Sequence, residues 1–295
     1  MAAAIDGVQW PLFVLFVTVR EAAVREAWIC TTCGTQYEPS EEPPVRCAIC
    51  EEERQYVLPT GQVWTTLAQL RKSHMATFRR EAELIGIGTS PAFGIGQRAL
   101  LVRTPAGNVL WDCVSLIDQA MVDIINALGG LTAIAISHPH YYTAMVDWSA
   151  AFGGIPVYLH AADRAWIMRS APCLELWSEQ TKQISPGLTL IRVGGHFDGG
   201  TVMHWAGGAG GKGALLSGDL LQVAPDRKFV SFMWSYPNFV PLGEKAVRAI
   251  AGRLEPWSYE VIYGAFWDRV IARDGKRVTA ASAERHIAIL NREAR

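Results

Sequence analysis

The chain has 295 residues, half of them hydrophobic, and a formal net charge of −1 at pH 7. This length accommodates one large domain with a small appendage, and the composition is that of a folded globular protein. The near-neutral charge argues against intrinsic disorder and against a nucleic-acid-binding surface spread over the whole molecule.

Residues 1–27 form an N-terminal extension that contains an apolar run at residues 8–19. The run is too short to span a bilayer, and Pro11 lies inside it. A cleaved secretion signal is the alternative, but no basic residue precedes the run, and Arg20 and Glu21 follow it directly. We therefore expect a cytoplasmic protein without membrane association, whose extension packs on the body or is poorly ordered.

Residues 28–58 hold four cysteines, Cys30, Cys33, Cys47 and Cys50, arranged as two C-x2-C pairs with thirteen residues between them. Two such pairs place four thiolates tetrahedrally around one Zn²⁺. The polar, proline-containing segment between the pairs cannot build a core, so the metal would supply its folding energy. Two disulfides are the alternative, for which the sequence offers little support.

This segment resembles the rubredoxin-like zinc ribbons. The resemblance implies one structural zinc ion, and it leaves contact with a protein partner open as a second role. Arg46 and Arg54 lie among glutamates and make no clear basic face, so binding of nucleic acid is not expected.

Residues 59–82 are predicted to be a linker followed by a helix, because residues 65–72 carry apolar positions at helical spacing. From residue 83 the pattern changes to strands and turns. Residues 84–88, 94–102 and 109–113 predict an antiparallel meander. A helix is expected over 118–128, where Gly129 and Gly130 end it.

The apolar segment 131–136 predicts a buried strand that ends just before His138 and His140. Pro139 between them limits the freedom of the loop. Neutral imidazole is the commonest protein ligand for zinc, and catalytic zinc sites commonly take three protein ligands plus water. From the pair alone, two unrelated loop histidines remain an equal alternative.

Further along the chain, two polar residues also emerge beside glycines at strand ends. They are His196, after Gly194 and Gly195, and Asp219, after Gly218. Strands are expected at 155–160, 188–193, 201–205 and 261–263, and helices at 143–152, 161–168, 243–254 and 280–293. Meanders interleaved with helices imply two sheets with helices packed outside them, an α+β fold.

In order and spacing, these residues resemble the signature of the metallo-β-lactamase superfamily over residues 83–295. The resemblance implies a four-layer αββα sandwich with its site along one edge. It also implies that His138, His140 and His196 bind a metal ion, with Asp219 as a fourth ligand or as the partner of the metal-bound water. Asp112 resembles the supporting aspartate of that family.

The sequence also departs from the family pattern. Tyr142 and Thr143 stand where the family has Asp-His, and Phe266 lies near the place of the final histidine. Both places supply ligands of the second metal, so we expect a single zinc ion at the histidine site. Tyr142 either donates a hydrogen bond to an oxyanion or packs with Phe266 in the unused cavity, and packing is the favoured interpretation. Asp147 has a weaker claim to a role in the site.

The favoured function is a mononuclear zinc hydrolase that acts on an ester, lactone, thioester or amide of a small molecule through metal-bound water. Asp219 would orient that water or accept its proton. The alternative is a non-catalytic, metal-bearing binding or scaffold protein that has lost the second metal site. Nucleic-acid processing is a weaker third hypothesis. Structural roles are expected for the remaining candidates, His160, His204, His286, Cys113 and Cys173.

Overall fold

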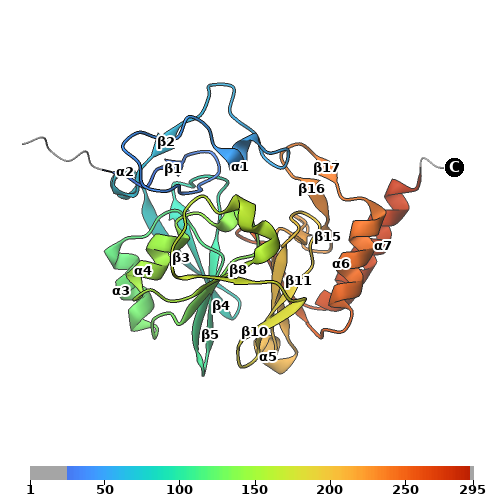
Figure 1. Ribbon diagram of the computed structural model, residues 1–295. Coiled ribbons are helices and arrows are strands. Elements are labelled where there is room, and N and C mark those ends of the chain that lie inside the picture. The colour runs from blue at the N-terminus through green and yellow to red at the C-terminus, as the bar shows by residue number, and fades with distance from the viewer. Residues whose placement is uncertain (1–24, 293–295) are drawn as a thin grey trace, which may run out of the picture.

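The computed structural model describes residues 25–292, which form two facing sheets with helices on both outer sides. Figure 1 shows α3 (Gln119–Ala127) and α4 (Met145–Ala151) beside one sheet, and α6 (Glu244–Leu254) and α7 (Gly275–Leu290) beside the other. The predicted αββα sandwich is therefore confirmed. The apolar run at residues 8–19 lies outside the described residues.

The larger sheet has seven strands, which follow one another in space as they do in the chain. The first four are antiparallel neighbours, and from the fourth strand onward the pairing is parallel. The strands are β3 (Met75–Glu81), β4 (Leu84–Ser90), β5 (Ala99–Thr104), β6 (Gly107–Trp111), β7 (Ala133–Ala135), β8 (Val157–His160) and β9 (Leu174–Trp177).

The second sheet has six strands in the order β10-β11-β12-β13-β18-β19, and only the β13–β18 pair is parallel. Its strands are β10 (Thr181–Ser185), β11 (Leu188–Arg192), β12 (Thr201–Trp205), β13 (Ala214–Gly218), β18 (Val261–Gly264) and β19 (Val270–Ile271). The short elements outside both sheets are α5 (Gly208–Gly211), η1 (Pro139–Tyr141), η2 (Ala161–Trp166), and the strand pairs β14 (Gln222–Val223) with β15 (Val230–Ser231) and β16 (Met233–Ser235) with β17 (Val240–Pro241).

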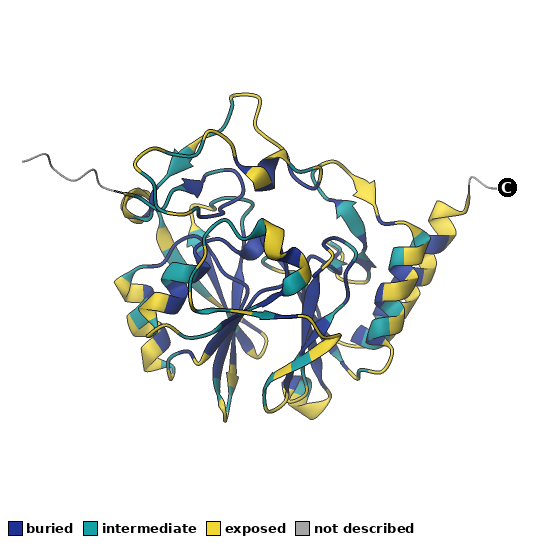
Figure 2. Ribbon diagram, viewed as in Figure 1, coloured by how far each residue is buried: buried dark blue, intermediate teal, exposed yellow. Residues whose placement is uncertain are grey.

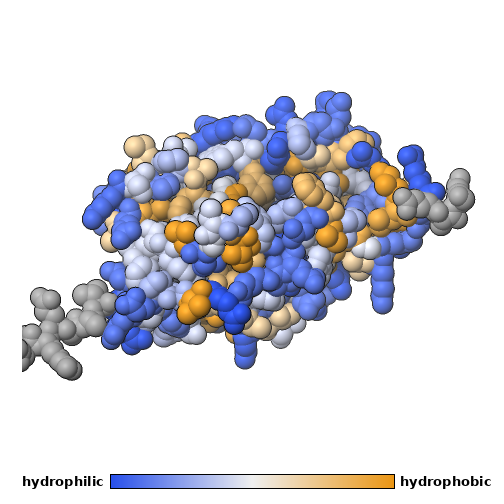
Figure 3. All heavy atoms as spheres, turned by 90° about the horizontal axis from the view of Figure 1, so that it is seen from above, coloured by the Kyte–Doolittle hydropathy of each residue, from blue (hydrophilic) through white to orange (hydrophobic). Residues whose placement is uncertain are grey.

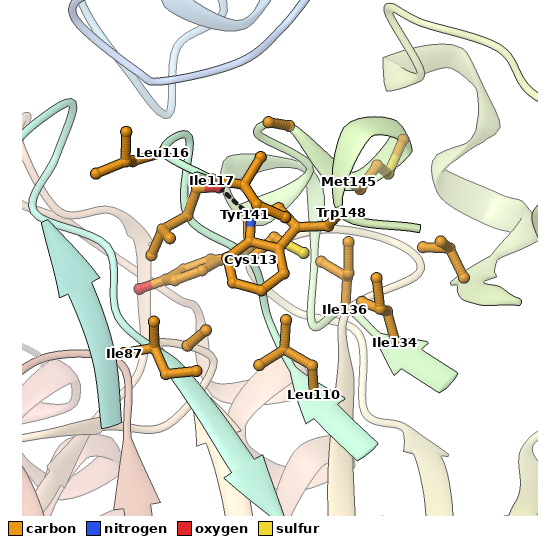
Figure 4. Packing of buried hydrophobic residues seen from close by; sticks show 14 of the residues in the cluster. Ile87, Leu110, Cys113, Leu116, Ile117, Ile134, Ile136, Tyr141, Met145 and Trp148 are labelled. Carbon is orange, nitrogen blue, oxygen red and sulfur yellow. Dashed lines mark hydrogen bonds between the residues drawn. The ribbon is translucent and has the colours of Figure 1, made fainter. Parts of the chain in front are cut away.

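Strand residues alternate between two cores, as the period of two in a strand requires. In β6, Leu110 packs with Trp148 of α4, whereas Val109 and Trp111 belong to the core between the two sheets. Figure 4 shows the first of these cores, where the Trp148 indole donates to the Val114 carbonyl at 2.9 Å. Figure 2 shows the sheets as the most deeply buried layers and the helices exposed only on their outer faces.

The segment predicted as a linker and helix, residues 59–82, contains α2 (Leu67–Ser73) but also the whole of β3. Strand β3 pairs with β4 along its full length at the edge of the larger sheet. Most of its side chains are exposed or half-buried, so it carries little of the apolar alternation that identifies a strand in a sequence. None of the helices in the described residues is both long and apolar enough to cross a membrane.

The four-cysteine module of residues 28–58 lies above the two sheets in Figure 1, at one end of the sandwich. It contains β1 (Ile29–Cys30) and α1 (Ala48–Glu51). Strand β1 pairs with β2 (Trp64–Thr65), so the small sheet is completed by residues that follow the predicted module.

Candidate metal centres

His138 and His140 leave the larger sheet just beyond the end of β7. Pro139 is the first residue of η1, where the missing proline N–H costs no helical hydrogen bond. The Tyr141 N–H donates to the His138 carbonyl at 3.0 Å and closes this single turn. The turn therefore directs both imidazoles into one buried cluster.

Glycines allow the other two ligand residues to reach the same place. Gly195 precedes His196 with φ +88°, and a Cβ there would lie 2.8 Å from a side chain of α6. Gly218 precedes Asp219 with φ +53°, and a Cβ there would lie 2.8 Å from Ser137 Oγ. Because only glycine combines this backbone conformation with so little space, the glycines beside both residues have a structural purpose.

The structure brings His138, His140, His196 and Asp219 together, with their candidate ligand atoms all within 4.8 Å of one another. His196 Nε2 lies 3.3 Å from His140 Nδ1, and His138 Nε2 lies 3.1 Å from Asp219 Oδ1. Burial lowers the pKa of His138 well below its usual value, so its contact with Asp219 is not an ion pair. None of the four residues is more than 3% exposed.

All three imidazoles are neutral and keep a free lone pair. Burial lowers the pKa of His140 well below its usual value and that of His196 to about 4. Nδ1 of His196 lies 2.7 Å from the Trp234 carbonyl, which only accepts hydrogen bonds, so Nδ1 carries the proton and Nε2, which faces His140 Nδ1, keeps its lone pair. Nδ1 of His138 is likewise paired with Ser137 Oγ at 3.0 Å.

The cluster fits a divalent metal ion. Three of its atoms, His138 Nε2, His140 Nε2 and Asp219 Oδ1, are buried and have no hydrogen-bond partner among the described residues. Buried polar atoms in folded proteins nearly always have a partner, and a bound cation would supply one. Imidazole nitrogens with one carboxylate oxygen form a ligand set that zinc accepts.

Asp112 stabilises the loop that carries His138 and His140 through backbone hydrogen bonds. Its Oδ1 accepts the Ser137 N–H at 2.7 Å, and its own N–H donates to the Ala135 carbonyl at 2.8 Å. Burial raises the pKa of Asp112 to about 7, and burial also raises that of Asp219 to about 7. The position of Asp112 is the one that the sequence resemblance implied for a supporting aspartate.

Tyr141, rather than Tyr142, lies against the cluster. The Tyr141 ring is 5.3 Å from that of His138, and after burial the nearby Asp219 carboxyl does most to raise its pKa. For Tyr142, burial and then the Asp163 carboxyl raise the pKa. The turn of η1 separates the two neighbouring phenols. Tyr142 is packed in the core that Phe266 also contacts, so we assign it no catalytic role.

The other candidates have structural partners. Asp147 accepts hydrogen bonds from Arg169 and Gln36, each at 2.8 Å, and so faces the four-cysteine module instead of the histidines. The remaining histidines bind backbone groups: His160 with the Ala162 N–H at 3.2 Å, His204 with the Ser258 carbonyl at 2.8 Å and His286 with the Leu242 carbonyl at 2.9 Å. Cys113 is a buried free thiol, and Cys173 is a half-buried one.

The four cysteines of the module form a second candidate metal centre. Cys30 Sγ lies 3.5 Å from Cys50 Sγ, and Cys33 Sγ lies 3.6 Å from Cys47 Sγ. These distances are far too long for disulfides, and they are close to the roughly 3.8 Å between thiolates tetrahedrally placed around zinc. Gln62 Nε2 donates to Cys30 Sγ at 3.0 Å, which stabilises a thiolate there.

The module is docked directly on the histidine site. Gln97 Nε2 donates to the Cys33 carbonyl at 2.6 Å and to the His140 carbonyl at 3.1 Å, so one amide joins the two candidate centres. Ser115 Oγ donates to the Gly34 carbonyl at 2.7 Å. Gln97 was not foreseen from the sequence, because nothing local to it indicates which distant carbonyls it meets.

A cavity of about 180 Å³ opens beside His140 and Asp219. Its other lining residues come from the module, from the loops around β4–β5 and β14–β17, and from the end of β18: Arg54, Gln55, Tyr56, Ile95, Gln222, Tyr236, Pro237 and Phe266. Figure 3 shows this end of the molecule from above, with apolar side chains interspersed among polar ones. Larger openings elsewhere, such as that around Arg227 and Arg277, contain none of the candidate ligands.

The sandwich and the ligand cluster at one end of it define a metallo-β-lactamase-fold protein. One similar solved structure is VMB-1, with a TM-score of 0.55 and 11% identity, covering 73% of this chain and 98% of that one. Another is DIM-1, with a TM-score of 0.54 and 14% identity, covering 71% of this chain and 97% of that one. The mono-zinc form of FIM-1 from Pseudomonas aeruginosa is also similar, with a TM-score of 0.50 and 18% identity, covering 71% of this chain and 95% of that one. At these identities the similarity shows the fold alone.

The chain belongs to the family of the uncharacterized protein YmaE from Bacillus subtilis (strain 168). The two sequences are 46% identical over 269 residues, which are 90% of this chain and 97% of YmaE. No family model matches the chain. The family relationship therefore extends through the four-cysteine module, whereas the three solved structures named above match 71–73% of the chain.

Proposed function

We propose that the protein is a hydrolase of small-molecule esters, lactones, thioesters or amides, with one zinc ion held by His138, His140 and His196 beside Asp219. The observation that carries this proposal is the convergence of three imidazoles and a carboxylate, two of which, His140 and Asp219, line a small cavity. A second zinc ion at the four cysteines serves a structural purpose. The small volume of the cavity, about 180 Å³, favours a small substrate over a polymer.

A single ion at the histidine site is supported by what surrounds Asp219. Among the described residues, Asp219 belongs to one group of candidate metal ligands only. Phenols of Tyr141 and Tyr236 lie near it, and the neighbouring Asp112 carboxyl is engaged by the Ser137 N–H. The mono-zinc form of FIM-1 is a precedent for one zinc ion in this fold.

A zinc ion at this place would lower the pKa of its water towards 7 and polarise a carbonyl oxygen of the substrate. Asp219 Oδ1 lies 3.1 Å from His138 Nε2, so this carboxylate would be placed to orient that water or to accept its proton. The Tyr236 hydroxyl donates to the backbone carbonyl of Asp219 and holds that residue in place. Phe266 and Tyr236 line the cavity.

The test combines metal analysis with hydrolysis of a panel of short esters, lactones and thioesters. Wild-type protein is expected to hold two zinc ions per chain, one for each candidate centre. His138→Ala should lose one ion and all hydrolysis, whereas His74→Ala, which alters a histidine on the connection between α2 and β3, should change neither. The proposal fails if the histidine site holds no metal or if His138→Ala leaves turnover intact.

A further inference from the structure

The segment that follows α1 in the four-cysteine module forms one wall of the cavity beside the histidine site. Arg54 Nη1 donates to the carbonyl of His196, a candidate metal ligand, at 2.8 Å. The guanidinium also lies over two aromatic rings, 3.8 Å from the Phe197 centroid and 4.5 Å from that of Trp234. These contacts fix the arginine in one orientation, with its side chain only 9% exposed.

The backbone of this segment is held from the other side as well. Asn238 Nδ2, in the connection between β16 and β17, donates to the Glu53 carbonyl at 2.9 Å and to the Gln55 carbonyl at 3.1 Å. Residues 53–55 are therefore clamped between the second sheet's loops and the histidine cluster. The clamp gives the cavity a preformed wall whose polar groups are already in position.

Several hydrogen-bonding groups on this wall are unused. Of the five N–H groups of a guanidinium, the Arg54 side chain uses one for Glu52 Oε2 at 2.7 Å and one for the His196 carbonyl, within the described residues. Gln55 is only 5% exposed, and its Oε1 has no partner there. The amide oxygen of Gln222, across the cavity, is also buried without a partner. The two amide oxygens call for hydrogen-bond donors on a ligand, whereas the unpaired N–H groups of Arg54 call for an acceptor.

The guanidinium of Arg54 determines the kind of ligand that this wall can bind. Arg54 is the one cation among the lining residues, and Glu52 already offsets part of its charge. A planar monoanion matches the free edge of the guanidinium. Ile95 and Phe266, which line the same cavity, are apolar.

We propose that Arg54 binds a carboxylate on the substrate, so that the module determines which substrates the histidine site accepts. The inference rests on the proposed function for its kinetic consequence, but the binding of a carboxylate does not depend on turnover. The module is then part of the substrate-binding site, in addition to any role of its metal in folding.

The kinetic test compares two methyl esters with the same number of carbon atoms, monomethyl succinate and methyl butyrate, with acid release followed in a pH-stat. Wild-type protein should prefer the succinate ester, and Arg54→Gln should lower kcat/KM for it by about 10- to 100-fold more than for the butyrate ester. Arg54→Lys keeps the positive charge but lacks the paired N–H groups of the guanidinium, so it should restore part of the preference. Arg46→Gln, in an exposed arginine of the same module, should change nothing.

The binding test titrates benzoate and benzamide by ligand-observed NMR, with metal content measured on every sample. Benzoate should bind wild-type and Arg46→Gln protein equally and Arg54→Gln protein at least 10-fold more weakly, with both metal ions retained. If benzoate binds Arg54→Gln as tightly as wild type, or no more tightly than benzamide, the carboxylate subsite is refuted. If benzoate binding follows the prediction but no ester is cleaved, the subsite stands and the hydrolase proposal fails.

Discussion

The amide of Gln97 is the most direct physical link between the two candidate metal centres, and Gln97→Leu tests what it contributes. The side chain is 5% exposed and donates to the Cys33 carbonyl at 2.6 Å and the His140 carbonyl at 3.1 Å. Leucine has a similar volume but no donor, so two carbonyls would be left in the interior unsatisfied. Each such acceptor costs about 1–3 kcal/mol, and we expect a total loss of about 2–4 kcal/mol of unfolding free energy.

The same substitution should weaken metal binding, because the amide orients the backbone of one candidate ligand residue at each centre. Loss of a partner of this kind commonly costs roughly 10–100-fold in metal affinity. Urea unfolding by circular dichroism in zinc-containing buffer measures the first effect, and competition with a chelator measures the second. Gln69→Leu, on the exposed face of α2, is the matched control and should stay within about 0.5 kcal/mol of wild type. A change below that value in Gln97→Leu, with unaltered metal affinity, would refute the reasoning.

Three further predictions concern other parts of the molecule. Burial raises the pKa of Asp163 from 3.8 to about 6, so its contribution to stability is complete below pH 3.8 and is lost as the pH rises through 6. Asp163→Asn keeps an acceptor for the Gly199 N–H and does not titrate. Between pH 4 and 7 the unfolding free energy of wild type, measured in urea, should therefore fall by about 3 kcal/mol relative to that of the variant. Parallel pH profiles of the two proteins would contradict this. Cys30→Ser should lower the metal content from two ions per chain to one by elemental analysis, because a neutral hydroxyl does not replace a thiolate; retention of both ions would place the metal elsewhere. Trp148→Phe should cost about 2–3 kcal/mol in urea unfolding, through the lost bond to a backbone carbonyl and the space left in the core, and an unchanged midpoint would show that the core closes around the smaller ring.

The sequence by itself determined the fold and the ligand residues of both candidate centres. The spacing of Cys30 and Cys33 predicts a metal-binding turn because two thiolates three residues apart can reach one ion. The histidine site was predictable for a related reason. Its ligands follow strand ends that the apolar pattern identifies, and the glycine before Asp219 marks a backbone that must pass another chain segment closely.

Only the tertiary structure decided which side chains surround those ligands. Tyr141 and Tyr142 are adjacent in the sequence, and a single turn of 3-10 helix sends one to the histidines and the other to Asp163. Arg54 and Gln97 meet the site through contacts across 142 and 43 residues of chain. No local pattern encodes such contacts, because they depend on how the module docks on the sandwich, and docking is set by packing between surfaces distant in the sequence.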